Sequence, residues 1–218
     1  MERMFERYKI DPKAIGRLEV GTETLIDKSK SVKSFLMKYL TDYGNFDVEG
    51  VMSVHACYGG TAALFNTVAW MESEAWDGRM GLVIMSDIAV YDDGSSRATA
   101  GAGAVALLIQ PNASLILEPL RSTHMMHQYD FYKPEMNSEY PTVNGKLSIR
   151  SYLACLTGCY NSLKAKYMKH FHSGLGLNDF DQVLFHSPFF KQVKKSFWNL
   201  AHQDMYHHFD PDLIVVLP

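Results

Sequence analysis

The sequence has no long basic run, few cysteines and no long apolar stretch, and each shortage excludes a class of protein. Its 21 Lys and Arg are balanced by 24 Asp and Glu, which gives no support for a nucleic-acid or anionic-membrane surface. The longest apolar stretch, residues 102–109, is far too short to cross a bilayer. Residues 1–7 are charged and lack the apolar centre of a signal peptide. Three cysteines cannot all pair, which predicts a reducing compartment, by default the cytoplasm.

The composition that remains is that of a packed core. Apolar residues make up 47% of the 218 residues and charged residues 21%, which disfavours disorder, collagen and coiled coil. This length is enough for one large α/β domain or two small ones.

Strand and helix patterns alternate along the chain, which predicts a layered α/β architecture. Short apolar runs bounded by turn residues predict strands at residues 17–21, 51–55, 81–86, 102–109, 115–117, 182–186 and 213–217. Helical spacing of apolar residues predicts helices at residues 28–39, 61–74 and 148–170 and from residue 191 onward. Residues 120–145 are polar and aromatic, and we expect a surface excursion there.

Cys57 is the residue most informative about chemistry. It lies between a predicted strand and a predicted helix, beside Gly59 and Gly60, which allow backbone N–H groups to approach a ligand. A thiol near a helix N-terminus feels the positive end of the helix dipole, which favours the thiolate. Backbone amides there could also form an oxyanion hole. The alternative is a buried structural cysteine, the commoner fate of a free thiol.

Two further residues are candidates, each with a structural alternative. His186 ends a predicted strand, where sheet enzymes place their ligands, but a hydrogen-bonded structural histidine is the commoner alternative. Glu19 alternates with Leu18 and Val20, so its carboxylate either faces solvent or is held for chemistry. The histidines near the C-terminus have loose spacing and no neighbouring Cys or carboxylate cluster, so we expect no metal site.

Several long motifs follow one another in a fixed order between residues 15 and 196. They are GRLEVGTET at 16–24, DKSKSVK at 27–33, ACYGGTA at 56–62, DIAVY at 87–91, YDFYKP at 129–134, NGKLS at 144–148 and FHSP at 185–188. With these motifs the chain resembles the 3-hydroxy-3-methylglutaryl-CoA synthase family of the mevalonate pathway, which has a thiolase-like fold.

The resemblance implies an acyltransferase and assigns roles in it. Cys57 would accept acetyl from acetyl-CoA as a thioester, and Glu19 would be the general base that removes a methyl proton. His186 would hold and polarise the second substrate, acetoacetyl-CoA. The product would be 3-hydroxy-3-methylglutaryl-CoA, with release of CoA. The CoA thioesters are substrates, and neither a metal nor a cofactor is implied.

The resemblance also implies contacts with substrate and CoA. Thr99 and Ser148 would contact substrate, and Ser95 occupies the position of an Asn that contacts CoA in the family. Lys191 and Lys195 lie four residues apart on one predicted helix face, which suits the phosphates of CoA. A solvated helix surface is the alternative for these two lysines.

Family members are roughly twice this long, so the resemblance implies a layered α/β/α fold truncated at both ends. Residues 1–118 would form most of an N-terminal half that carries the nucleophile, and residues 119–218 the start of a C-terminal half that carries the histidine. The family fold implies a homodimer. The alternative is a truncated, non-catalytic paralogue or isoform that pairs with a full-length subunit. An incomplete gene sequence is a third possibility.

Overall fold

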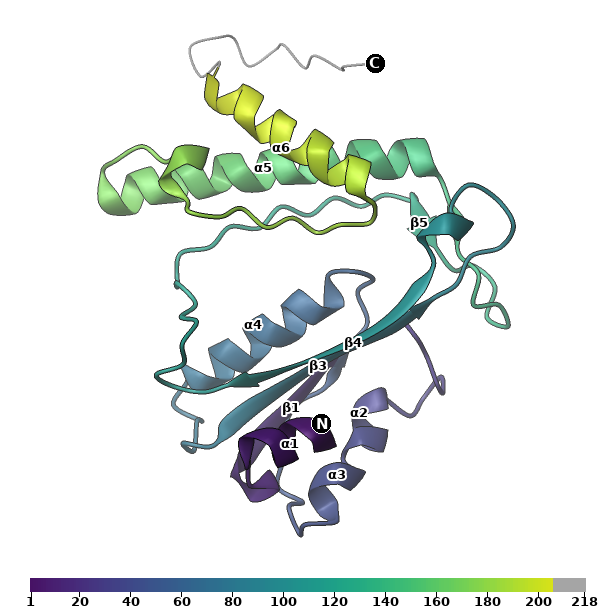
Figure 1. Cartoon of the computed structure of the whole chain (residues 1–218), viewed down its shortest axis with the longest axis vertical. Coiled ribbons are helices and arrows are strands. Elements are labelled where there is room, and N and C mark those ends of the chain that lie inside the picture. Colours follow the sequence, from purple (N-terminus) through teal and green to yellow (C-terminus); the bar gives the residue numbers. More distant parts are fainter. Residues whose placement is uncertain (206–218) are drawn as a thin grey trace. The chain divides into compact units, whose positions relative to one another are not determined.

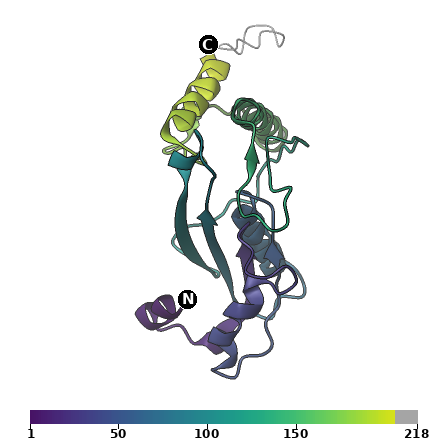
Figure 2. The same ribbon diagram turned by 90° about the vertical axis from the view of Figure 1, so that its right-hand side faces the viewer.

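A computed structural model describes residues 1–205 of the chain, which form two compact units (Figures 1 and 2). The first unit comprises residues 1–89 and 100–116. The second comprises residues 90–99 and the chain from residue 117 onward.

A four-stranded sheet with the order β2-β1-β3-β4 is the centre of the first unit. Strand β1 runs parallel to both β2 and β3, and β4 pairs with β3 antiparallel in an unbroken ladder from Gly81–Ile109 to Ala89–Gly101. The strands are β1 (Ile15–Gly21), β2 (Met52–Ser53), β3 (Met80–Ala89) and β4 (Gly101–Ile109).

Helices cover both faces of this sheet (Figure 1). Leu18 and Val20 of β1 and Leu82 of β3 pack in the core against Phe5 and Leu40, on the side of the short helices. These helices are α1 (Glu2–Tyr8), α2 (Val32–Leu36) and α3 (Lys38–Thr41), with a 3-10 turn η1 (Pro12–Ala14) between α1 and β1. Each fully buried Leu or Val side chain contributes about 1.5–3 kcal/mol through its removal from water.

Helix α4 (Gly59–Met71) packs on the opposite face of the sheet. Because side chains alternate along a strand, the odd-numbered residues of β1 and β3 face this helix. Arg17 of β1 lies over the ring of Trp70, and a Cβ built on Gly81 would meet Thr67. The first unit therefore has the predicted α/β/α layering.

Two helices dominate the second unit, α5 (Gly145–Phe171) and α6 (Phe190–Met205). Asn144 caps α5, because its side chain accepts a hydrogen bond from the N–H of Leu147. The other elements are the 3-10 turns η2 (Arg97–Thr99) and η3 (Leu177–Asp179) and a two-stranded ribbon of β5 (Phe131–Tyr132) and β6 (Thr142–Val143).

Asp204 ties α6 to α5 and to η3. Its carboxylate accepts hydrogen bonds from the Tyr160 hydroxyl at 2.6 Å, the Leu177 N–H at 2.7 Å and the Lys164 ammonium at 3.3 Å. Although burial raises the pKa of Asp204, these donors outweigh it and hold that pKa below its ordinary value. Burial and the neighbouring carboxylate raise the pKa of Tyr160 strongly. This cluster stabilises the helix pair.

Two predicted strands are wrong, since residues 115–117 and 182–186 have no regular structure. Leu115, Ile116 and Leu184 are 81–90% exposed. No strand lies beside either segment among residues 1–205, so nothing pairs with their backbone groups. The predicted helix at 28–39 is divided into α2 and α3, and the predicted strand at 213–217 lies outside the described residues.

None of the helices described between residues 1 and 205 is both long and apolar enough to span a membrane.

Candidate active site

Cys57 lies on a sharp turn between β2 and α4. Ala56, the preceding residue, has φ of 41°, in the left-handed region that costs an L-residue about 1–2 kcal/mol. The turn is closed by hydrogen bonds from the N–H of Tyr58 to the carbonyl of His55 and from the N–H of Gly59 to the carbonyl of Ala56. Backbone strain of this kind concentrates at functional sites, and here it occurs beside an exposed cysteine at the start of a helix.

Glycines allow the end of β1 to approach the start of α4. A Cβ built on Gly21 would lie 2.4 Å from the carbonyl carbon of Gly59 and from the nitrogen of Gly60. Real side chains do not tolerate such contacts, so only glycine fits at position 21. Gly21 therefore allows the close packing that brings the residues that follow β1 near the thiol.

The turn that follows β1 is held by one carboxylate oxygen. Oδ1 of Asp87, near the end of β3, accepts hydrogen bonds from Thr22 Oγ1 at 2.9 Å and from Thr24 Oγ1 at 3.1 Å. It also accepts the N–H groups of Glu23 at 2.8 Å and Thr24 at 3.1 Å. These bonds fix the backbone of Glu23 although Asp87 is more than sixty residues away in sequence.

The pKa of the Cys57 thiol is raised. Incomplete hydration of the thiol is the largest cause, and the negative charges of Glu23 and Asp87 add to it. The expectation that the helix dipole lowers this pKa is therefore wrong, because two carboxylates and partial desolvation outweigh the dipole. The thiol form of Cys57 is favoured, so the residue needs a base to become a nucleophile.

Glu19 lies in a different environment, in the middle of β1 and completely buried. Its Oε1 accepts hydrogen bonds from the Arg17 guanidinium at 2.7 and 3.0 Å, while no hydrogen-bond donor contacts Oε2 within the described chain. Arg17 in turn lies over Trp70 and bonds to Glu49 at 3.2 Å. These contacts are those of a structural ion pair, and the charge of Glu19 is not among the causes of the Cys57 shift.

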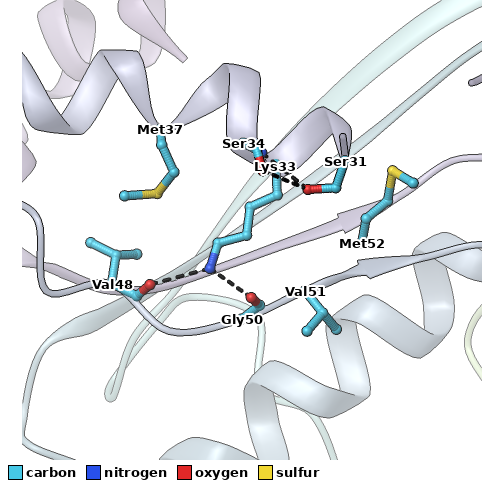
Figure 3. Close-up of a pocket in the computed structure, with 8 residues that line it drawn as sticks. All are labelled: Ser31, Lys33, Ser34, Met37, Val48, Gly50, Val51 and Met52. Atoms are coloured by element: carbon cyan, nitrogen blue, oxygen red, sulfur yellow. Dashed lines mark hydrogen bonds between the residues drawn. The ribbon is translucent and has the colours of Figure 1, made fainter. Parts of the chain in front are cut away.

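A cavity of about 480 Å³ lies on the other side of β1 from α4, between α2 and residues 48–52 (Figure 3). Lys33 extends across it and donates hydrogen bonds to the carbonyls of Val48 at 3.2 Å and Gly50 at 2.6 Å. Burial lowers the pKa of Lys33. None of the predicted site residues lines this cavity. Lys33 instead fixes the segment that leads through β2 to Cys57.

His186 lies in the second unit, in a segment without regular structure. The prediction that it ends a strand is wrong, but the residue is partly buried. Its ring is stacked on that of Tyr152 of α5, and the Tyr152 hydroxyl donates a 2.7 Å hydrogen bond to the His186 carbonyl. Burial lowers the pKa of the His186 imidazole, which favours the neutral ring.

The predicted contacts with substrate and CoA all lie in the second unit. Ser148 is in the first turn of α5 and half-buried, whereas Ser95 and Thr99 are exposed in and beside η2. Lys191 and Lys195 are exposed on α6, each next in sequence to a buried residue, Gln192 or Ser196. No cluster of three or more metal-ligating side chains occurs within residues 1–205.

Sequence reasoning missed Glu23. The first unit brings Glu23 and Asp87 near Cys57 and leaves Glu19 in the interior of the sheet layer. One signal could have found it: Glu23 comes two residues after Gly21, which ends β1, so it lies where the chain leaves the sheet and functional side chains are common. Glu19 is flanked by apolar residues that continue the strand.

A layered α/β/α unit with cysteine on a strained turn into the helix that covers the sheet defines the thiolase-like class. The family model described as "Hydroxymethylglutaryl-coenzyme A synthase N terminal" matches residues 1–114, and "Hydroxymethylglutaryl-coenzyme A synthase C terminal" matches residues 115–213. The chain therefore belongs to the hydroxymethylglutaryl-CoA synthase family.

Curated relatives agree with this assignment. The chain is 53% identical to a hydroxymethylglutaryl-CoA synthase of Ganoderma lucidum, over 94% of the chain and 45% of that protein. It is 54% identical to the cytoplasmic enzyme of Gallus gallus (94% and 40% covered) and 52% identical to the mitochondrial enzyme of Rattus norvegicus (94% and 41% covered). The chain thus spans less than half the length of these relatives.

Solved structures lead to the same family. The structure of MvaS in complex with 3-hydroxy-3-methylglutaryl coenzyme A matches with a TM-score of 0.86 and 32% identity, over 99% of the chain and 52% of MvaS. An HMG-CoA synthase complexed with CoA matches with a TM-score of 0.75 and 30% identity, over 87% of the chain and 47% of that protein.

Proposed function

We propose that the chain catalyses the condensation of acetyl-CoA with acetoacetyl-CoA to 3-hydroxy-3-methylglutaryl-CoA, through an acetyl thioester on Cys57. The observation that carries this proposal is the strained turn at Cys57, which presents a thiol beside two carboxylates. Family membership, and the HMG-CoA and CoA held by related structures, support the choice of substrates.

The first step transfers acetyl to Cys57. The thiol loses its proton, Sγ attacks the thioester carbonyl of acetyl-CoA, and the bond to the CoA sulfur breaks so that CoA leaves as its thiol. The N–H groups at the start of α4 are suited to stabilise the oxyanion that develops on the carbonyl oxygen. A raised thiol pKa makes deprotonation of Cys57 dependent on a neighbouring base.

The second step requires a base for a methyl proton of the acetyl group, which the thioester acidifies. The resemblance gave this role to Glu19. The geometry favours Glu23, because its charge acts on Cys57 and its backbone is fixed by Asp87. The ion pair of Glu19 with Arg17 points to a structural role.

The resulting carbanion attacks the ketone of acetoacetyl-CoA and forms the new carbon–carbon bond. His186 is proposed to hydrogen-bond the ketone oxygen and to stabilise the alkoxide that develops there, which takes up a proton to become the 3-hydroxyl group of the product. Water then hydrolyses the thioester, which releases the product and returns Cys57 to the thiol. These groups suffice for the chemistry, so we propose that no metal or redox cofactor takes part.

The second unit is proposed to bind CoA and substrate. Lys191 and Lys195 present two ammonium groups on one exposed helix face, an arrangement that suits phosphates. Ser148, Ser95 and Thr99 offer hydroxyl groups for hydrogen bonds to substrate or CoA.

Incubation with radiolabelled acetyl-CoA tests the nucleophile and the base separately. We expect Cys57→Ala to lose the covalent label while Cys155→Ala, a second free cysteine, retains it. Glu23→Gln should still accept acetyl but fail in condensation, measured as CoA released when acetoacetyl-CoA is added. Glu19→Gln should condense normally if it folds. Full labelling of Cys57→Ala, or condensation by Glu23→Gln, would contradict the assignment.

We further propose a homodimer that forms across the β2 edge of the sheet. Strand β2 ends the sheet on one side and immediately precedes the Cys57 turn. Val51 and Val54, which flank β2, are 57% and 55% exposed, so the edge offers both unpaired backbone groups and apolar side chains. Light scattering after size-exclusion chromatography should show a dimer for the wild type and a monomer for Val54→Lys.

The cytoplasm is the proposed compartment. The three cysteines are free, as a reducing environment maintains them, and a cytoplasmic relative is among the similar proteins. Because a mitochondrial relative is nearly as similar, cell fractionation is the test.

One observation favours the alternative of a non-catalytic subunit. Leu115, Ile116 and Leu184 are 81–90% exposed, which suits burial against a further polypeptide. Copurification of the chain with a full-length synthase, without CoA release by the chain alone, would favour this second candidate.

A further inference from the structure

We infer that Tyr152 is a positioning residue for His186: its hydroxyl and its ring hold an otherwise untethered segment against α5. This inference rests on the proposed function of His186.

The segment that carries His186 has little support of its own. Residues 182–187 adopt neither helix nor strand, and no backbone hydrogen bond joins residues 181–188 to another part of the described chain. In Figure 1 the chain runs back along α5 from the end of that helix to the start of α6. Side-chain contacts must therefore decide where the imidazole lies.

Tyr152 makes two such side-chain contacts with His186. Its hydroxyl donates a 2.7 Å hydrogen bond to the His186 carbonyl, which fixes the backbone. Its ring is stacked on the imidazole, with an interplanar angle of 26° and centroids 6.2 Å apart, which restricts rotation of the side chain. A backbone bond and a ring contact together define both the place and the orientation of the imidazole.

Tyr152 is itself held firmly. It lies two turns into the 27-residue helix α5, and its side chain is partly buried. The facing helix α6 presents the buried Ser196, whose hydroxyl also interacts with the Tyr152 hydroxyl. The hydrogen bond between Tyr160 and Asp204 joins α5 to α6, so the phenol ring of Tyr152 belongs to a helix that is held by its neighbour. The proposed function gives Tyr152 no contact with substrate of its own, so its effect would pass through His186.

The test follows the imidazole directly, by NMR titration of the full chain with isotope-labelled histidine. The His186 signal is identified among the nine histidines by its loss in His186→Gln. Burial lowers the pKa of His186 in the wild type. Tyr152→Phe, which keeps the ring, should move this pKa up towards its ordinary value, and Tyr152→Leu, which loses ring and hydroxyl, should move it further.

Two control variants separate positioning from general loosening. Tyr167→Phe removes a hydroxyl from the same helix, at a ring that contacts Phe171, and should leave the His186 titration unchanged. Tyr160→Phe breaks the bond to Asp204 and should lower stability, again without moving that titration. An equal shift in Tyr160→Phe would overturn the inference, as would an unchanged titration in folded Tyr152→Leu. Should Tyr152→Leu not fold, Tyr152→Phe decides in the same way.

Kinetics supply the second readout. Tyr152→Phe should lower kcat/KM for acetoacetyl-CoA about fivefold, the value of one neutral hydrogen bond, while acetylation of Cys57 stays at the wild-type rate. An equal loss in both half-reactions would contradict positioning of His186. If the wild type forms no HMG-CoA, the proposed function fails, and the NMR titration still decides whether Tyr152 holds His186.

Discussion

Substitution of Gly21 by alanine tests whether close approach of β1 to α4 holds the Cys57 turn in place. The added Cβ would lie 2.4 Å from two backbone atoms, whereas ordinary contacts are 3.4–4 Å. Backbone cannot rotate away as a side chain can, so we take the upper end of the overpacking range, about 3 kcal/mol. Alanine regains about 0.5–1 kcal/mol over glycine in a strand. The net loss of stability is then about 2 kcal/mol.

Gly103→Ala in β4 is the matched control, because nothing lies within 4 Å of a Cβ built there. This variant should keep or slightly raise the wild-type stability. With a urea m-value of about 2 kcal/mol/M, Gly21→Ala should unfold at about 1 M less urea than the wild type. The alkylation rate of Cys57 should also change in Gly21→Ala alone. Equal midpoints for the two variants, with unchanged alkylation, would refute the packing argument.

Three further predictions concern charged groups and their hydrogen bonds. Since the negative charge of Glu23 raises the pKa of Cys57, Glu23→Gln should lower that pKa and speed alkylation of Cys57 by iodoacetamide at pH 8 about threefold. Glu19→Gln is the control and should not change the alkylation rate. Equal rates for the two variants would argue against an effect of Glu23 on Cys57. Tyr160→Phe should cost about 1.5–3 kcal/mol in urea unfolding, because it removes a hydrogen bond to a charged group. The pKa of Asp204 is lowered in the folded state, so its stabilisation is complete above its unfolded pKa of about 3.9 and disappears as the pH falls through the folded value. Asp204→Asn should therefore lose less stability on acidification than the wild type; an equal loss would show that other carboxylates control acid unfolding.

Elements with a clear pattern and a partner in the chain were predictable. Residues 15–21, 80–89 and 101–109 form strands because each has a neighbour to pair with. Residues 182–186 have the same apolar character, but no strand of the described chain lies beside them to pair with. A local sequence pattern cannot indicate whether a pairing strand is present. Helices α5 and α6 follow their apolar spacing, since adjacent turns determine most of their geometry.

The candidate site was predictable only as far as single residues. The glycines and the strand-to-helix boundary identify Cys57. They do not reveal that Asp87, thirty residues after Cys57, orders the backbone of Glu23 and helps to raise the pKa of Cys57. Nor does the chemistry of Glu19 differ from that of Glu23 in the sequence. What singles out Glu19 in the structure is its ion pair with the Arg17 guanidinium. Such distinctions depend on long-range contacts.

The β3–β4 ladder has a consequence for the order in which the first unit folds. Its two strands are joined by residues 90–100 alone, so closing this loop costs little entropy. Strand β1 must instead find β3 across residues 22–79, a slower event. We therefore expect amide protons of the β3–β4 hairpin to become protected first during refolding. Gly21 and Asp87 meet their partners only when β1 docks, so the reactive cysteine acquires its surroundings in the last stage of folding.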